Sequence, residues 1–171
     1  MQKFTESNIT LDFPDGNFFR FSLCAGYKAL SGNHFKEMDA CWYDAGSNVY
    51  WLLELKDYSS ASLTASETIE QKSWDMVKKA IDSVCMFLAC KHCYPYSVNL
   101  NPCFPFVPDD HTKFNVVTIV HCDRAQKPDI QLLNEQFRRK FKPYAVLFGI
   151  TSYSVVEHSA ASRCIPNNMV V

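Results

Sequence analysis

The chain has 171 residues, of which 47% are hydrophobic and 14% aromatic, a composition that supports one folded domain and excludes a disordered chain. Seventeen basic and eighteen acidic residues give a net charge of −1, so any contact with nucleic acid must come from a local patch. The sequence has no apolar run of membrane-spanning length, and it begins without the hydrophobic stretch of a signal peptide. We therefore expect a cytoplasmic protein whose eight cysteines are reduced thiols.

The first part of the chain has the pattern of a β-hairpin. Residues 9–13 alternate apolar and polar side chains, the turn-forming residues 14–17 follow, and residues 18–23 continue as a second strand. Residues 24–33 fit either a short helical turn or a loop.

Residues 35–56 predict a second hairpin, around which we expect the rest of the chain to be arranged. Two segments rich in aromatic and apolar residues flank the turn-forming residues 44–48. A turn centred near Gly46 sets a register in which the numbers of paired residues sum to about 93. This register pairs Asp39 with Glu54.

Three charged side chains share one face at the far end of this hairpin, because side chains alternate between the two faces of a strand. They are Asp39, Glu54 and Lys56, and the opposite face is strongly apolar and should be the core side. Paired carboxylates are a ligand set for Mg²⁺ or Mn²⁺, and a neighbouring lysine can orient the attacking water. Glu37 lies on the same face, either as a further acid of the site or as an exposed strand charge.

A long amphipathic helix is predicted over residues 67–89, from apolar residues repeating at helical spacing. Thr64 or Ser66 can cap it, with Glu67 or Glu70 completing a capping box.

The polar side chains of this helix leave two interpretations open. Gln71 and Lys72, in its first turns, either reach the charged end of the hairpin or lie on an exposed face. Lys78 and Lys79, further along, are expected on a solvated face.

Four residues after this helix have the side chains of a zinc site. They are Cys90, Cys93, Cys103 and His111, but their irregular spacing also fits partly buried reduced thiols.

The last part of the chain predicts a strand–helix–strand unit. Residues 114–120 form a nearly continuous β-branched run, residues 128–141 an amphipathic helix, and residues 144–151 a second apolar run. Such a unit adds parallel strands to a sheet. Residues 152–171 are expected to be a tail or an edge strand.

The densest basic patch lies at the end of the predicted 128–141 helix. Arg138, Arg139 and Lys142 either contact phosphates or form a solvated helix C-terminus, where cations offset the helix dipole.

The charged hairpin resembles the PD-(D/E)xK nuclease superfamily. The resemblance rests on Met38-Asp39, where methionine replaces the proline of the motif, and on Glu54-Leu55-Lys56. It implies an α/β fold with a restriction-endonuclease-like mixed β-sheet flanked by helices, with a core over about residues 18–151. The family's opening helix, which often carries an extra glutamate, is not evident here.

The resemblance also implies an activity. In this family Asp39 and Glu54 would hold Mg²⁺ or Mn²⁺ and Lys56 would serve the attacking water, giving a metal-dependent endonuclease whose expected substrate is DNA rather than RNA. Small nucleases of this kind work with a protein partner or as homo-oligomers, often in bacterial or phage restriction and antiviral defence. The alternatives are a catalytically inactive nuclease-fold binding or assembly module, and an unrelated α/β protein whose hairpin end is merely charged.

Overall fold

The centre of the fold is a five-stranded mixed β-sheet with the strand order β3-β4-β5-β6-β7. The computed structural model describes residues 2–14, 16–59, 68–166 and 169–171. The strands are β3 (Phe18–Phe19), β4 (Ala40–Asp44), β5 (Val49–Asp57), β6 (Lys113–His121) and β7 (Ser152–Glu157). The first three pair antiparallel, whereas β5, β6 and β7 run parallel. The chain is therefore an α/β protein, and β6 is the interior strand that residues 114–120 predict.

The β4–β5 hairpin has the register that the turn residues predict. Cys41 lies opposite Leu52 and Tyr43 lies opposite Tyr50, so the numbers of paired residues sum to 93. Since β4 begins at Ala40, Asp39 lies just before the strand.

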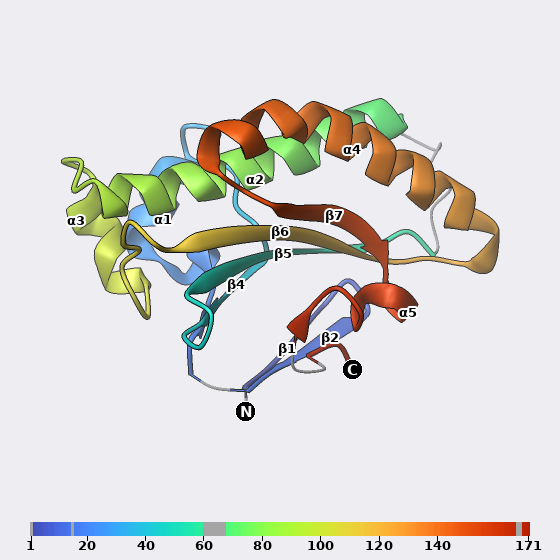
Figure 1. Ribbon diagram of the computed structural model, residues 1–171, viewed down its shortest axis with the longest axis horizontal. Helices are drawn as coiled ribbons and strands as arrows, with labels where there is room; N and C mark the ends of the chain where they lie inside the picture. Colours follow the sequence, from blue (N-terminus) through green and yellow to red (C-terminus); the bar gives the residue numbers. More distant parts are fainter. Residues whose placement is uncertain (1, 15, 60–67, 167–168) are drawn as a thin grey trace.

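Both faces of the sheet are covered. Helices α2 (Ile69–Lys91) and α4 (Lys127–Phe148) lie on one face, and β1 (Gln2–Glu6), β2 (Ile9–Phe13) and α5 (His158–Ala161) lie on the other (Figure 1). Two hydrophobic cores result, with Tyr50 and Leu52 on the side of the long helices and Trp51 and Leu53 on the side of β1 and β2.

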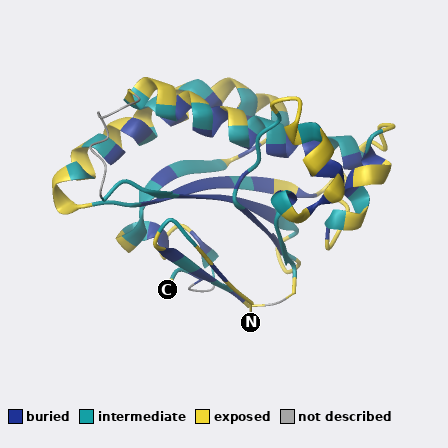
Figure 2. Cartoon of the chain, turned by 180° about the vertical axis from the view of Figure 1, so that it is seen from behind, coloured by how far each residue is buried: buried dark blue, intermediate teal, exposed yellow. Residues whose placement is uncertain are grey.

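The expectation of one core face is therefore wrong. The strands between the two layers are buried, and the helices expose only their outer sides (Figure 2). The charged end of the hairpin lies beneath α2. The alternation of side chains along the two strands does not reveal this, because it says nothing about what covers each face.

The predicted first hairpin is also wrong. Strand β2 pairs with β1, and β3 has two residues that pair with β4. The chain then leaves the sheet as the 3₁₀ helix η1 (Phe21–Leu23), which buries the Phe21 ring against Phe87 and Phe104. Residues 24–33 contain a short helix, α1 (Ala25–Ser31), as one of the two alternatives predicts.

Helix α2 begins later than its predicted start. Thr68 is the N-cap, and its hydroxyl accepts from the backbone N–H of Gln71 while the Gln71 side chain accepts from the N–H of Thr68. This reciprocal pair is a capping box. The predicted caps Thr64 and Ser66, with Glu67, lie outside the described residues.

Residues 144–151 do not form the predicted strand. Helix α4 continues through Pro143 to Phe148 and ends at Gly149, whose φ of 67° is the left-handed conformation that glycine adopts readily. Ala145 continues the buried face of the helix one turn beyond Phe141. Residues 144–148 therefore continue the helix, which buries one side of the apolar run, instead of forming a strand.

The last strand of the sheet lies beyond the predicted core. Residues 152–157 form β7 at the edge of the sheet, which is the edge-strand alternative for the tail. Between α2 and β6 the chain forms α3 (Ser97–Leu100) and the 3₁₀ helix η2 (Asn101–Cys103), and η3 (Arg124–Gln126) precedes α4.

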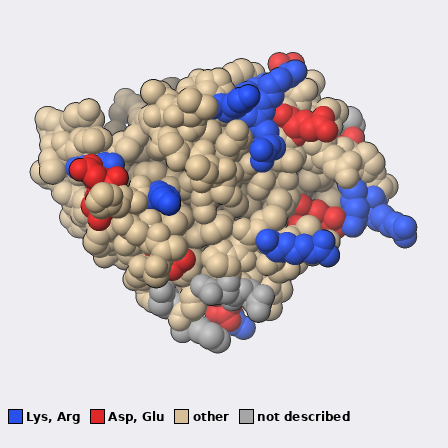
Figure 3. Space-filling view, viewed as in Figure 1, with Lys and Arg blue, Asp and Glu red and all other residues tan. Residues whose placement is uncertain are grey.

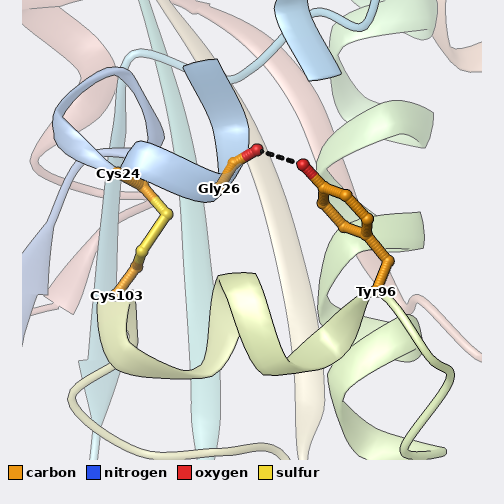
Figure 4. Close-up of a disulfide and its surroundings, with 4 residues drawn as sticks. All are labelled: Cys24, Gly26, Tyr96 and Cys103. Atoms are coloured by element: carbon orange, nitrogen blue, oxygen red, sulfur yellow. Dashed lines mark hydrogen bonds between the residues drawn. A yellow bond between two sulfur atoms is a disulfide. The ribbon is translucent and has the colours of Figure 1, made fainter. Parts of the chain in front are cut away.

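A disulfide joins Cys24 to Cys103, which contradicts the expectation that all eight cysteines are reduced (Figure 4). The two residues are 79 positions apart in sequence, yet the packing of α1 against α3, which η2 follows, brings their Cα atoms to 5.6 Å. Chain spacing alone does not reveal such a pair.

Removing this crosslink should destabilise the protein. We expect the Cys24→Ala/Cys103→Ala double variant to lose about 2–4 kcal/mol of unfolding free energy, because the bond closes a long loop in the unfolded chain. Urea unfolding with and without a reducing agent measures the loss. Cys93→Ala, at an exposed free cysteine, is the control and should unfold like the wild type. A double variant as stable as the oxidised wild type would contradict the prediction.

Gly26 marks a close approach between α1 and α3. A Cβ atom there would lie 2.2 Å from the backbone oxygen of Asn99, and the Tyr96 hydroxyl donates to the Gly26 carbonyl at 2.8 Å (Figure 4). Gly26→Ala should therefore lower the free energy of unfolding by about 2 kcal/mol, a typical cost of overpacking. Gly16→Ala is the matched control in a urea titration, because an added Cβ there would meet no other described residue within 4 Å. Equal stability of the two variants would show that α1 and α3 separate freely.

Among the residues that the structure describes, no helix is long and apolar enough to cross a membrane.

Candidate functional site

The predicted acidic residues meet where β5 runs past the start of β4, beneath α2. Glu54 belongs to β5 and is fully buried, with 0% of its surface exposed. Asp39 approaches from the segment that leads into β4.

The position of Asp39 follows from the end of β4. Because β4 pairs with β5 only as far as Leu53, the edge of β5 beyond that residue is free to bond elsewhere. The backbone N–H of Leu55 donates to Asp39 Oδ2 at 2.8 Å. On the preceding residue, the Met38 N–H donates to the Ser83 hydroxyl of α2 at 2.9 Å. Asp39 is thus held between the sheet and the helix.

Two lysines contact the acidic pair. Lys56 Nζ lies 2.6 Å from Glu54 Oε1. Lys79 Nζ donates to the same oxygen at 2.6 Å and to Asp39 Oδ1 at 3.3 Å. The structure therefore brings Asp39, Glu54 and Lys56 together and adds Lys79 as a bridge between the carboxylates.

The expectation that Lys78 and Lys79 share a solvated face is wrong for Lys79. The Lys79 side chain is 21% exposed and points from α2 toward Glu54 in the sheet. The Lys78 side chain is 45% exposed and pairs with Asp82 at 2.7 Å. Consecutive residues of a helix are about 100° apart, so neighbours face different directions. The spacing of Lys72, Met76 and Lys79 could have predicted the inward direction of Lys79, because it places both lysines on the same side of the helix as a buried methionine.

Burial dominates the electrostatics of Glu54. Burial, assisted by the negative charge of Asp39, raises the pKa of the carboxyl to about 7 against the opposing charges of Lys56 and Lys79. For Lys79, burial by itself lowers the pKa, but the attraction of Glu54 and Asp39 outweighs burial and raises the pKa of the ammonium well above its ordinary value. Lys79 is therefore a permanent cation at neutral pH, and Glu54 titrates there.

A pocket of about 240 Å³ opens beside Glu54. Lysine side chains dominate its lining, which is formed by Lys36, Glu54, Lys56, Tyr58, Lys72, Asp75, Met76 and Lys79. The pocket therefore places a buried carboxylate among lysine side chains, an arrangement that attracts anionic ligands.

The acidic pair suits a hard divalent cation. Glu54 Oε2 is buried and has no hydrogen-bond partner among the described residues, so one carboxylate oxygen remains as an acceptor. Mg²⁺ commonly binds one or two carboxylates and completes its shell with water and substrate phosphate. No third acid, histidine or cysteine joins the pair as a metal-binding group in the part of the chain that the structure describes. Asp39 and Glu54 are thus a minimal ligand set that fits Mg²⁺ or Mn²⁺.

The three auxiliary candidates have different positions. Glu37 is half-buried and close enough to Asp39 and Lys79 to feel their charges; burial is the main reason that its pKa is raised. Lys72 lines the pocket, with its Nζ 5.3 Å from the centre of the Tyr58 ring. Gln71 caps the start of α2 instead.

The predicted basic patch lies on α4, outside the pocket lining. Arg138 donates to the Tyr153 carbonyl of β7 at 2.9 Å, and its guanidinium lies over the Tyr153 ring. Arg139 donates to the Gln136 side chain at 2.5 Å. Lys142 is exposed. On the face shown in Figure 3, one basic group lies over α4, with acidic side chains beside it.

The predicted zinc residues do not share one environment. Cys103 is bonded to Cys24, and burial raises the pKa of the Cys90 thiol to about 12, which disfavours a thiolate ligand. Cys93 is exposed, and the backbone N–H of His111 donates to Asp109.

Comparison of the chain with protein-family profiles, with curated protein sequences and with solved structures found no match.

Proposed function

We propose that this protein is a metal-dependent nuclease that hydrolyses phosphodiester bonds, with DNA as the expected substrate. The observation that carries the proposal is the convergence of Asp39, Glu54 and Lys56 at the end of one antiparallel hairpin, with a free buried oxygen on Glu54. The parallel strand β6, which follows α2 in the chain, also supports the proposal, because a restriction-endonuclease-like fold would place such a strand beside the hairpin.

In this proposal Asp39 and Glu54 hold Mg²⁺ or Mn²⁺, which when bound acts as a Lewis acid toward the phosphate and activates a water. Lys56 orients the attacking water. The water oxygen bonds to phosphorus and gives a proton to solvent, the bond to the leaving ester oxygen breaks, and that oxygen takes a proton from solvent. Lys36 and Lys72, which line the pocket, attract the phosphate backbone.

The basic lining compensates for the near-neutral chain. A net charge of −1 gives little long-range attraction to nucleic acid, so the affinity must come from the few lysines of the pocket or from a partner protein. A partner-directed or self-associating nuclease fits this charge balance.

A cleavage assay tests the proposal. We expect the purified protein to cut supercoiled, linear or single-stranded DNA when Mg²⁺ or Mn²⁺ is added, and EDTA to stop the reaction. Glu54→Gln should abolish cleavage while keeping the shape of the side chain. RNA in a parallel reaction determines which nucleic acid is preferred. Equal cleavage by wild type and Glu54→Gln would indicate a contaminating nuclease and contradict the proposal.

The binding-module alternative has one observation in its favour. Asp39 and Glu54 contact Lys56 and Lys79, so two negative and two positive charges already balance without a metal. A module of this kind would bind no Mg²⁺ in calorimetry and would cut no substrate. The nuclease would bind Mg²⁺ and cut its substrate.

A further inference from the structure

Thr118 lies beside Glu54 in the sheet and has no assigned role. The two residues are register partners on the parallel strands β5 and β6, so their side chains extend from the same face about 4.8 Å apart at the backbone. Thr118 is 1% exposed. Its hydroxyl therefore lies in the same buried layer as the Glu54 carboxylate, beneath α2.

Both side chains carry a buried oxygen without a hydrogen-bond partner among the described residues. These atoms are Glu54 Oε2 and Thr118 Oγ1. A buried polar group without a partner costs about 1–3 kcal/mol, so such groups normally pair. These two oxygens belong to neighbouring residues on adjacent strands, so each is a candidate hydrogen-bond partner for the other.

The other neighbours of Thr118 on the sheet are apolar. The residues that β6 turns to the same face, Phe114, Val116 and Val120, are apolar members of the core beneath the long helices. On the next strand its register partner is Val155. Glu54 is therefore the polar neighbour that the sheet gives to the Thr118 hydroxyl.

We propose that Thr118 is a positioning residue for Glu54, whose Oε2 it fixes by a hydrogen bond so that the oxygen can accept a divalent cation. The adjacent positions of the two residues on β5 and β6 place the hydroxyl on the same side of the sheet as the carboxylate. A carboxylate oxygen has two lone pairs, so Oε2 can accept from Thr118 and bind a metal together. The inference rests on the proposed metal-dependent function.

Magnesium binding, measured by titration calorimetry without nucleic acid, tests the role of Thr118. We expect Thr118→Val, which keeps the shape but loses the hydroxyl, to weaken Mg²⁺ affinity by about 10- to 100-fold, the usual effect of removing a group that orients a metal ligand. Thr118→Ser retains the hydroxyl and should bind Mg²⁺ like the wild type. Ser73→Ala removes another buried hydroxyl, whose partners are Glu70 and Lys140, and should leave the affinity unchanged.

The outcomes separate this inference from the proposed function. Wild-type affinity in Thr118→Val, or an equal loss in the valine and serine variants, would overturn the positioning role, even if the wild type cuts DNA. A loss confined to Thr118→Val supports the role, even if no nucleic acid is cut and the nuclease proposal fails. A wild type that binds no Mg²⁺ overturns both.

Discussion

Lys56→Ala should lower the rate of phosphodiester cleavage by about 10²- to 10⁴-fold, the usual contribution of a group that orients or deprotonates an attacking water. The variant should still fold, because the Lys56 side chain is 33% exposed and its removal leaves no core cavity. Glu54 keeps a cation partner in Lys79 at 2.6 Å. Magnesium affinity should therefore change little, since Asp39 and Glu54 supply the ligands.

The measurement is single-turnover cleavage at saturating Mg²⁺, with the metal affinity determined separately by calorimetry. Lys113→Ala is the matched control: this exposed lysine begins β6 and pairs with Val49, at the opposite end of β5 from Lys56. The control should cleave at the wild-type rate. A Lys56→Ala rate equal to that of the control would exclude a role for Lys56 in the chemical step.

Lys79→Met should lower the free energy of unfolding by about 3 kcal/mol at pH 8, because it leaves a buried carboxylate with one cation partner instead of two. Lys78→Met provides the matched control on the same helix. Lys78 pairs with Asp82 at the surface four residues away, and such pairs contribute about 0.5 kcal/mol or less. Urea unfolding of both variants measures the difference.

The effect of Lys79→Met should depend on pH. The pKa of Glu54 is about 7 in the folded protein, against an ordinary value of 4.5. Between these values the folded state binds more protons than the unfolded state, so the free energy of unfolding falls as the pH rises. Removing Lys79 takes away a charge that favours the ionised carboxylate, which raises the pKa of Glu54 further and extends this fall to higher pH.

We therefore expect the variant to be closest to the wild type near pH 5.5, where Glu54 is protonated in both proteins, and furthest from it near pH 8.5. Lys79 itself stays charged across this range, because its pKa is raised. A difference that is constant with pH would show that lost packing of the lysine stem, rather than the charge pair, causes the destabilisation.

The sequence by itself determined the hairpin that carries the acidic pair and the strand and helix that follow it. A turn at residues 44–48 between two apolar segments leaves one register, and that register is local, so Cys41 and Leu52 pair as predicted. The run over residues 114–120 is long and β-branched enough to specify a buried strand.

Only the tertiary structure decided what covers the hairpin. The burial of Glu54, the direction of Lys79 and the neighbour of Thr118 all depend on α2 and β6 packing against β5, contacts between residues far apart in sequence. The same reason explains the two errors of greatest consequence. The apolar run after Pro143 stays helical because α4 buries one side of it, and Cys24 meets Cys103 because α1 packs against α3. Local patterns specify elements, whereas packing selects their partners and their ends.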